Sequence, residues 1–328
     1  MGDLKLSIAI GDYDRVRAVA RGTAPIEGVD PVFLFLEPEE IFFRAFRSAE
    51  FDMCELSLSS YTLTTAKGLC PYVAVPVFPS RAFRHTAITV RKDRVKSPED
   101  LKGRRVGIPE YQLTANVWAR ALLEDQFGVK PSDIRWVQGG IDQPGRVEKV
   151  AFTLPEGVVM EPAPADKSLS DLLVSGEIDA MVAPRPPRGF GREPNIGWLF
   201  DDPIAAASDY FRATRIFPIM HVLGIRRELV AEHPWLPSAV VKAFTRAKDM
   251  ALARLVDPSA SNVSLPFLEE TARRARALMG DDYWSYGLEP NRHVLETFLS
   301  HHHRQGLSPR LLACEELFVP SSLESFRI

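Results

Sequence analysis

The feature that most constrains this chain is a regular alternation of short apolar runs with stretches of helical character, starting at the N-terminus. The runs typical of strands are residues 4–10, 32–36, 53–56 and 73–78. The stretches of helical character between them are residues 14–20, 38–47 and 59–67. Strands that alternate with crossover helices pair in parallel and carry helices on both faces of the sheet. The alternation therefore predicts an α/β fold with a largely parallel sheet.

A second series of the same kind starts near Thr86 and is followed by a mainly helical C-terminal third. The predicted strands of this part are residues 86–90, 105–108, 136–138, 178–183 and 216–225. The predicted helices are residues 114–127, 168–174, 234–254, 265–279 and 291–305, and the sequence also turns helical after Asp202. Pro and Gly mark residues 183–192 as a loop. Apolar residues recur at helical spacing in the last three helices, which predicts a helical layer at the C-terminal end.

Length and charge limit the class of protein. With 328 residues, the chain is long enough for about two domains with a buried core. Its 40 basic and 43 acidic side chains give a net charge of −3, so the chain has no basic excess with which to neutralise a phosphate backbone. A hydrophobic content of 45% is that of an ordinary globular protein. Nucleic acid is therefore not an expected partner.

The cysteines and the N-terminal residues bear on the compartment. Cys54, Cys70 and Cys314 form no CxxC pair, and their odd number suits free thiols in a reducing compartment. Residues 1–10 alternate like a strand and lack the basic head and long apolar run of an export signal. No stretch approaches the 18 continuous apolar residues expected of a membrane span. We therefore expect a cytoplasmic protein that has no membrane partner.

Several local phrases resemble one family. They include DLKGRRVG at residues 100–107, SRAFRH at 80–85 and FPIMH at 217–221. Further matching segments are residues 51–61, 76–79, 108–112, 139–146, 178–180, 183–187 and 216. The first phrase is widespread among binding proteins with the type 2 periplasmic-binding-protein fold, whereas the other two are more specific and favour a decarboxylase-like branch of that fold. Together the segments resemble the 4,5-dihydroxyphthalate decarboxylase family across nearly the whole chain.

The resemblance implies an architecture and an activity. The fold would have two lobes with two hinge crossings and a helical C-terminal layer. Residues 1–84 and 217–328 would form the first lobe and residues 85–216 the second, with a ligand cleft between them. The reaction would convert 4,5-dihydroxyphthalate to 3,4-dihydroxybenzoate (protocatechuate) and carbon dioxide by protonating the ring. This chemistry requires no cofactor, because the hydroxyl para to each carboxylate can supply electron density to the carboxylated carbon.

Candidate substrate-binding residues follow from the position of strand ends. In open α/β sheets, ligands bind beyond the carboxyl ends of the strands, where helix N-termini point at the crevice. The residues that this rule selects are Arg81, Arg84, Arg185, Ser57, Ser59, Ser60, Tyr111, Gln112 and Thr114. Arginine can bind a carboxylate through two parallel hydrogen bonds, and hydroxyl groups at helix starts leave backbone N–H groups for an anion. The ordinary alternatives are solvated surface arginines and hydroxyls that only cap helices.

Three residues are candidates for proton transfer. His85 and His221 stand at ends of the strands that would cross between the lobes, and histidine exchanges protons near neutral pH. Glu55 follows the third predicted strand and is the other candidate. Structural roles for each remain the alternative, and the sequence leaves open which residue is acid and which is base.

No cofactor and no metal are expected. The run His301, His302 and His303 could suggest a metal site, but consecutive residues on a helix point about 100° apart and cannot share one face. The sequence contains no GxGxxG motif, phosphate-binding loop or GxSxG elbow. These observations disfavour nucleotide cofactors and serine hydrolysis.

Two other functions share the predicted fold. A solute receptor could close on an aromatic carboxylate and deliver it to a transporter, using the same arginines. An enzyme of the same fold could instead dehydrate another carboxylated ring, as a relative of the menaquinone-pathway dehydratases would. In every case the expected partner is a small aromatic carboxylate, and a homo-oligomer is possible.

Overall fold

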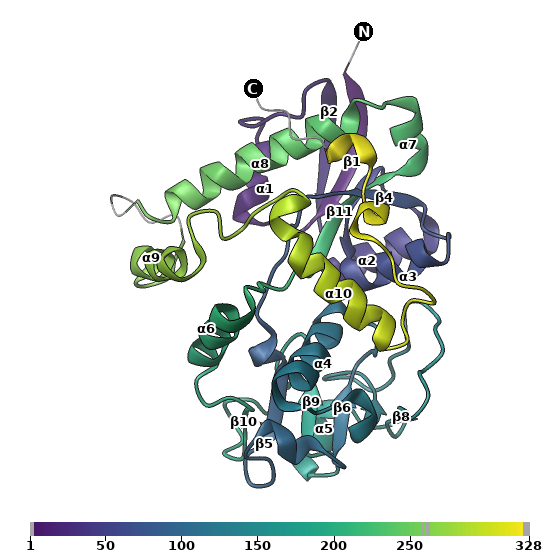
Figure 1. Ribbon diagram of the computed structural model, residues 1–328, viewed down its shortest axis with the longest axis vertical. Coiled ribbons are helices and arrows are strands. Elements are labelled where there is room, and N and C mark those ends of the chain that lie inside the picture. Colours follow the sequence, from purple (N-terminus) through teal and green to yellow (C-terminus); the bar gives the residue numbers. More distant parts are fainter. Residues whose placement is uncertain (1–2, 258, 260–262, 324–328) are drawn as a thin grey trace.

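Two β-sheets, one above the other in Figure 1, organise the computed structural model, which describes residues 3–257, 259 and 263–323. The first sheet has the strand order β2-β1-β3-β11-β4. Its strands are β1 (Leu4–Ile10), β2 (Val29–Phe35), β3 (Met53–Ser57), β4 (Tyr72–Val75) and β11 (His221–Arg226). β11 therefore lies between two strands that both end before residue 76, far earlier in the sequence.

The second sheet is built from the middle of the chain and has the order β10-β5-β9-β6-β7-β8. Its strands are β5 (Ile88–Arg91), β6 (Arg105–Ile108), β7 (Arg135–Gln138), β8 (Val159–Pro162), β9 (Ala180–Val182) and β10 (Ile196–Trp198). The chain therefore leaves the first sheet after β4, forms the second sheet, and returns to the first sheet with β11.

The expectation of a largely parallel arrangement is correct only in part. β1 pairs in parallel with β2 and β3, and β6 pairs in parallel with β7 and β9. β11, however, is antiparallel to both β3 and β4, and β5 is antiparallel to β9 and β10. The physical reason is the path of the chain. β11 returns from the other sheet, so it starts where β3 and β4 end and runs in the opposite direction to them. Both sheets are consequently mixed.

The helices match the sequence periodicity closely. The helices that precede β11 are α1 (Asp14–Ala20), α2 (Pro38–Ser48), α3 (Leu58–Ala66), α4 (Thr114–Phe127), α5 (Leu169–Ser175) and α6 (Pro203–Thr214). Those that follow it are α7 (Arg227–Glu232), α8 (Leu236–Arg254), α9 (Leu268–Met279) and α10 (Arg292–Arg304). Three short elements, α7, β8 and β10, were not predicted. The predicted strand at 216–225 begins only at His221, because Pro218 cannot donate to a strand ladder.

Local signals explain several boundaries. Asp202 accepts hydrogen bonds from Ile204 N and Ala205 N and so caps α6, with Pro203 in the first turn. Ser168 caps α5 by accepting from Asp171 N. Gly128 ends α4 in the left-handed conformation, with φ of 61°. None of the helices in the described part of the chain is both long enough and apolar enough to cross a bilayer.

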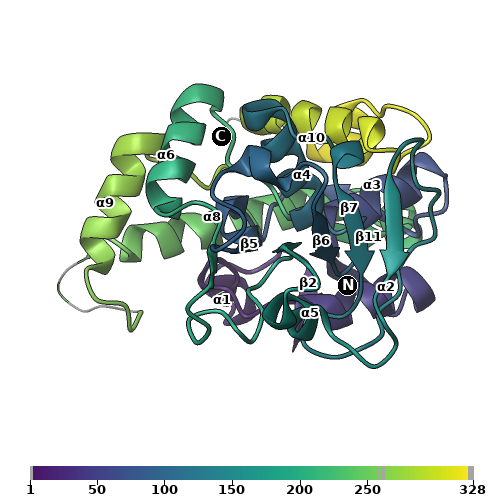
Figure 2. The same ribbon diagram turned by 90° about the horizontal axis from the view of Figure 1, so that it is seen from below.

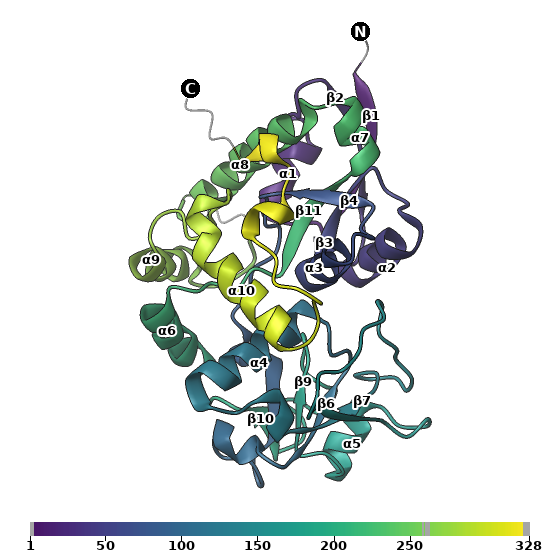
Figure 3. The same ribbon diagram turned by 45° about the vertical axis from the view of Figure 1, so that its right-hand side comes forward.

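The C-terminal helices contact both halves of the molecule rather than one. α8 packs against α1, whereas α10 packs against α4 and α9 packs against α6 (Figures 2 and 3). Arg120 of α4 donates to the side chain of Gln305 at 2.8 Å, just beyond the end of α10. The predicted helical layer therefore exists, and it connects the two units of the molecule. The first unit is the sheet that contains β1 with its helices, and the second unit is the sheet that contains β6 with its helices.

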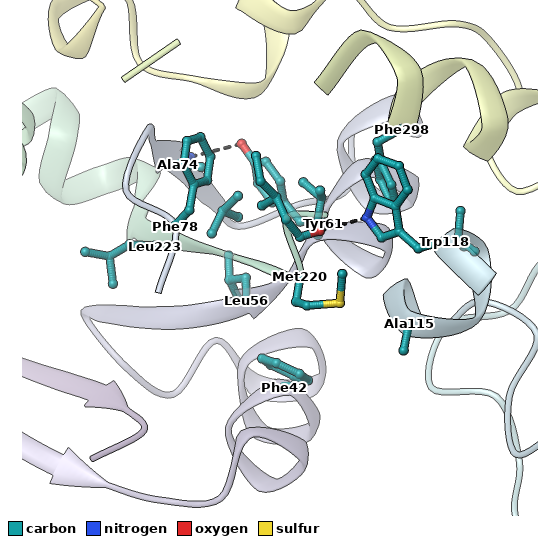
Figure 4. Packing of buried hydrophobic residues seen from close by; sticks show 14 of the residues in the cluster. Phe42, Leu56, Tyr61, Ala74, Phe78, Ala115, Trp118, Met220, Leu223 and Phe298 are labelled. Atoms are coloured by element: carbon teal, nitrogen blue, oxygen red, sulfur yellow. Dashed lines mark hydrogen bonds between the residues drawn. The ribbon is translucent and has the colours of Figure 1, made fainter. Parts of the chain in front are cut away.

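One hydrophobic core runs through the junction of the two sheets. Ile8 of β1 and Val106 of β6 belong to the same continuous cluster of buried side chains. At the junction, Trp118 of α4 packs against Phe298 of α10 and donates its indole N–H to the carbonyl of Ile219 at 2.9 Å (Figure 4). Because core side chains from both units interlock here, the polar residues beside them are held in fixed positions.

Candidate active site at the junction of the two sheets

The clearest functional geometry is a buried carboxylate bound to a histidine. Glu55 on β3 and His221 at the start of β11 project from neighbouring antiparallel strands, and Glu55 Oε1 lies 2.5 Å from His221 Nδ1. Glu55 is fully buried and also accepts hydrogen bonds from Tyr13 OH at 2.9 Å and Gly11 N at 3.0 Å. Burial acts to raise the pKa of Glu55, but His221 and these hydrogen bonds outweigh it and lower the pKa. The carboxylate is therefore ionised at neutral pH.

The other ring nitrogen of His221 is available for chemistry. An ionised Glu55 requires a proton on Nδ1, so Nε2 is either a free acceptor or the second donor of an imidazolium. Nε2 makes no hydrogen bond within the described residues, and the side chain is 16% exposed. Phe42 packs against the ring edge-to-face, with centroids 4.8 Å apart. His221 is thus oriented on one side by Glu55 and Phe42 and is open on the other.

Arg84 supplies a cation near the start of β11. Its Nε lies 2.9 Å from the sulfur of Met220, the residue before His221. Within the described residues, no carboxylate pairs with Arg84. Burial lowers the pKa of Arg84 to about 10, which still leaves the guanidinium positively charged at neutral pH. An unpaired, half-buried guanidinium is a suitable partner for a substrate carboxylate.

Hydroxyl groups from the predicted helix starts join the two units. Ser57 Oγ and Thr114 Oγ1 are 2.9 Å apart, and Thr114 Oγ1 also accepts from Ser59 N at 3.0 Å. Ser60 Oγ bonds the side-chain amide of Gln112 at 3.1 Å. Ser57 makes no capping bond within its own helix, and Thr114 instead caps α3 from the other unit. The structure therefore brings five of the predicted residues together as a buried contact between the units.

Arg81 lies in a different environment from Arg84. It is 7% exposed, and it donates to the carbonyls of Phe217 at 3.1 Å and Ser285 at 2.7 Å and to the side-chain oxygen of Asn291. Burial lowers its pKa to about 9. These bonds engage both terminal nitrogens of the guanidinium and tie the segment before β11 to the start of α10.

Tyr111 and Arg185 are also engaged elsewhere. The Tyr111 ring stacks on Phe152, lies 3.7 Å from the guanidinium carbon of Arg120, and is fully buried. Arg185 is 59% exposed and pairs with Asp142 at 2.5 Å on the second unit. The structure thus does not bring these two residues to the Glu55 and His221 pair.

His85 sits in an apolar cage. Its ring contacts those of Phe83, Phe200 and Tyr210, with centroid separations of 6.4, 5.0 and 5.6 Å. Burial lowers the pKa of His85 to about 4, so the ring is neutral at neutral pH. Nδ1 is buried without a hydrogen-bond partner among the described residues. This environment favours a structural role over proton transfer.

The histidine run points in three directions, as the helical geometry requires. His301 Nε2 is 2.6 Å from Asp125, His302 Nε2 is 2.9 Å from Ser59 Oγ, and His303 Nδ1 is 2.9 Å from the Ser308 carbonyl. Nowhere in the described ranges do three or more His, Cys, Asp or Glu side chains gather in a way that could hold a metal ion.

Several residues of the junction were not predicted from the sequence. Tyr13 follows β1 at the same sheet edge as the predicted residues, so the strand-end rule could have identified it. Glu110 is buried and pairs with Arg146 at 2.5 Å and with Lys149 at 2.8 Å, and both cations also reach Glu39 of α2. This ion-pair cluster connects the units, and it joins residues too far apart in sequence for any local motif to reveal.

Comparison with known proteins places this geometry in context. A family model described as NMT1/THI5 like matches residues 46–154. A curated protein of Comamonas testosteroni named 4,5-dihydroxyphthalate decarboxylase is 56% identical over 330 aligned positions, which cover the whole of both chains. A protein of the same name from Pseudomonas putida is 55% identical over 215 positions, or 65% of this chain and 83% of that protein.

Solved structures with a similar fold are much more distant in sequence. Protein AF1704 from Archaeoglobus fulgidus has a TM-score of 0.53 at 16% identity and covers 92% of this chain and 98% of its own. The alkanesulfonate-binding protein SsuA from Xanthomonas axonopodis pv. citri has a TM-score of 0.51 at 12% identity and covers 98% of both chains. These likenesses confirm the periplasmic-binding-protein-like α/β fold. From its full-length identity to the curated relative, the chain belongs to the 4,5-dihydroxyphthalate decarboxylase family.

Proposed function

We propose that this protein decarboxylates 4,5-dihydroxyphthalate to 3,4-dihydroxybenzoate and carbon dioxide. The observation that carries the proposal is the Glu55 and His221 pair, 2.5 Å apart, in which His221 Nε2 makes no hydrogen bond among the described residues. Arg84, which has no carboxylate partner among those residues, contacts Met220, the residue before His221. Two curated relatives at 55% and 56% identity carry the name of this activity. Site and family therefore support the same reaction class, a carboxy-lyase.

The chemistry needs a proton at one ring carbon. Each carboxylate of the substrate is para to a hydroxyl, so loss of the phenol proton to solvent moves electron density onto the carboxylated carbon. That carbon then accepts a proton, and its bond to the carboxylate breaks. The electron pair of the broken bond returns to the ring, the phenolate is restored, and carbon dioxide leaves. The phenolate regains a proton from solvent, so the net reaction consumes one proton.

His221 is the group that delivers this proton in our proposal. Glu55 holds Nδ1 and stabilises the charged imidazolium, which leaves Nε2–H to serve as general acid toward the ring carbon. Solvent returns the proton to His221 after each turnover. Tyr13 is a positioning residue, because its hydroxyl group donates to the same oxygen of Glu55 that faces His221.

Arg84 binds the carboxylate that stays on the ring. A cation on the departing carboxylate would oppose its conversion to neutral carbon dioxide, so the unpaired guanidinium suits the retained group. In this proposal Ser57, Ser59, Ser60, Gln112 and Thr114 fix the two units against each other rather than hold substrate. Arg81 and His85 serve the fold, because their surroundings are protein carbonyls in one case and aromatic rings in the other.

We also propose the cytoplasm as the compartment. Cys54, Cys70 and Cys314 are free and buried, and burial raises the pKa of each thiol, which keeps all three unreactive. Fractionation of the native host with detection of this chain tests the location. Recovery in the periplasmic fraction would contradict it.

The test of the activity is direct. Purified protein, stripped of metal by chelation, is incubated with 4,5-dihydroxyphthalate, and carbon dioxide and 3,4-dihydroxybenzoate are measured together. His221→Ala and the matched control His293→Ala, on the exposed face of α10, are assayed alongside. We expect equal amounts of the two products from the wild type and from His293→Ala, and a loss of at least about 100-fold in His221→Ala.

The other outcomes separate the alternatives. Tight binding without turnover would indicate a solute receptor, which the likeness to sulfonate-binding proteins makes the second candidate. Turnover that is lost on chelation and restored by a divalent metal would overturn the metal-free chemistry. Conversion of the substrate without carbon dioxide release would indicate a dehydratase.

A further inference from the structure

Arg15 occupies an unusual position across the edge of the first sheet. It stands in the first turn of α1, directly after β1, and its Nε donates to the carbonyl of Pro79 at 2.6 Å, beyond the end of β4. The strand order places β3 and β11 between β1 and β4. The side chain of Arg15 therefore spans the edge where β3 ends and β11 begins, which is the location of Glu55 and His221.

The neighbours of Arg15 connect it to the proposed site on two sides. Its guanidinium carbon lies 4.3 Å from the centre of the Tyr13 ring, and Tyr13 OH donates to Glu55. On the other side, Pro79 precedes Ser80, whose carbonyl accepts the backbone N–H of His221 at 3.3 Å. One aromatic ring, that of Tyr13, thus separates the cation from the carboxylate and imidazole pair.

The guanidinium is held rigidly. It is sandwiched between the Tyr13 ring and the Trp284 ring, whose centre is 4.2 Å from the guanidinium carbon. Trp284 is itself fixed, because its indole N–H donates to the carbonyl of Phe78 at 3.0 Å. Stacking between two aromatic faces and a carbonyl bond at Nε orient the planar group before any ligand arrives.

Arg15 also retains unused hydrogen-bonding capacity. Nη1 donates to Asp14 at 3.1 Å, but Nη2 makes no hydrogen bond to another residue in the part of the chain that the structure describes. The Arg15 side chain is 16% exposed, whereas that of its partner Asp14 is 39% exposed. Solvent therefore screens much of the attraction between the Asp14 carboxylate and the Arg15 guanidinium. A cation of this kind is available to an anionic oxygen of a ligand.

We propose that Arg15 binds the phenolate oxygen of the substrate, an assignment that rests on the decarboxylase function proposed above. Arg15 spans the sheet edge at which Glu55 and His221 lie, and its Nη2 is unused among the described residues, so it can donate to the oxygen of a substrate bound at that edge. When the phenol O–H bond breaks, its proton passes to solvent and the negative charge remains on the oxygen that faces Nη2–H. Arg84 binds the retained carboxylate, so the two cations have different tasks.

The proposal predicts a spectroscopic signature. Catechols absorb at longer wavelength when ionised, so the phenol pKa of bound 3,4-dihydroxybenzoate can be followed by absorbance as a function of pH. We expect the wild type to lower this pKa by at least about one unit relative to the free ligand, because a preorganised cation favours the oxyanion. In Arg15→Met the bound pKa returns toward the free value, and Arg15→Lys, which keeps the charge, restores part of the shift.

Steady-state kinetics give a second readout. Arg15→Met is expected to lower kcat by about 100-fold with little change in KM, since the charge that Arg15 stabilises develops after binding. Arg84→Met is expected to raise KM and leave the bound phenol pKa unchanged. The matched control is Arg17→Met on the same helix, where Arg17 is 45% exposed and pairs with Asp12 outside the site. Thermal melting confirms that each variant is folded.

Each result has one meaning. If Arg15→Met and Arg15→Lys retain the wild-type phenol pKa and kcat, the assignment of Arg15 is overturned while the decarboxylase function stands. If Arg84→Met shifts the phenol pKa as much as Arg15→Met does, the division of tasks is overturned. If the wild type releases no carbon dioxide, the decarboxylase function itself fails, whatever the Arg15 variants do.

Discussion

At the scale of single residues, the hexapeptide SRAFRH shows how one pattern can place two identical side chains in opposite environments. Arg81 and Arg84 are three positions apart, yet Arg81 donates to three protein oxygens, whereas the one side-chain hydrogen bond of Arg84 within the described residues is to a sulfur atom. The partners of Arg81 come from residues 217, 285 and 291, which no local spacing could reveal. The sequence could therefore select both arginines as candidates, but it could not tell which of them the fold would bind to protein oxygens.

This contrast predicts opposite effects of the same substitution. Arg81→Met should lower the free energy of unfolding by about 3 kcal/mol, because it leaves buried acceptors without a donor. Arg84→Met should change stability little and raise KM by about 30-fold, the cost of one charge-assisted contact with substrate. Urea denaturation and steady-state kinetics on both variants provide the measurement. A large KM change in Arg81→Met with unchanged stability would reverse the two roles.

At the scale of elements, α3 and α4 meet end to end through one hydroxyl group. Thr114 at the start of α4 accepts from the backbone N–H of Ser59 in α3 and bonds Ser57, so a residue of the second unit caps a helix of the first. The strand-end rule placed both segments at a common site, and the structure confirms that they meet. The strand-end rule could not predict that the two segments would form hydrogen bonds with each other, because hydroxyl groups at helix starts usually cap their own helix.

Thr114→Val is expected to destabilise the protein by about 2 kcal/mol, because it leaves the buried Ser59 N–H without an acceptor. The matched control is Thr62→Val in α3, where the hydroxyl donates to the Leu58 carbonyl of its own helix and to no other group in the described part of the chain. Chemical denaturation of both variants measures the difference. Equal destabilisation in the two variants would show that the contact between the units contributes nothing beyond an ordinary buried hydroxyl.

The segment between β7 and β8 contains a carboxyl group with a strongly perturbed pKa. Burial, assisted by the nearby Glu110, raises the pKa of Glu148 from 4.5 to about 7. Between these two pH values the unfolded chain is ionised at this position while the folded protein keeps the proton. The folded state therefore binds more protons, and its stability falls as the pH rises from 4.5 to 7.

Glu148→Gln should remove this contribution, because glutamine does not titrate. We expect melting temperatures of the variant, relative to the wild type, to rise as the pH increases from 4.5 to 7, and to level off above pH 7. Thermal melts at half-unit pH intervals provide the test. A difference between the two proteins that stays constant across this range would mean that Glu148 titrates normally in the folded state.

At the scale of the whole molecule, the α/β class and most element positions could be predicted because they depend on local periodicity. Residues 14–20 and 114–127 were predicted as helices with the bounds that the structure shows. The strand order, the antiparallel β11 and the position of α10 against α4 depend on contacts between distant parts of the chain. For the same reason Glu55 and His221 were predicted separately, as two candidates, and not as a bonded pair.

The shared core predicts that the two sheets unfold together. Buried residues of both sheets form one cluster, and α10 packs against α4 while the segment after it pairs with β4 at Ala74 and Phe318. Differential scanning calorimetry should therefore show one transition whose calorimetric and van't Hoff enthalpies agree. Two resolved transitions would instead show that the units are independently stable.

The return of β11 also sets an order for folding during synthesis. The second sheet uses residues 88–198 and is fully available once residue 198 has left the ribosome. The first sheet lacks the strand between β3 and β4 until residue 226 has emerged, although its first strand is made at the start. The nascent chain must therefore hold its N-terminal strands incomplete while the middle of the sequence folds, so the part of the protein that is made first is completed last.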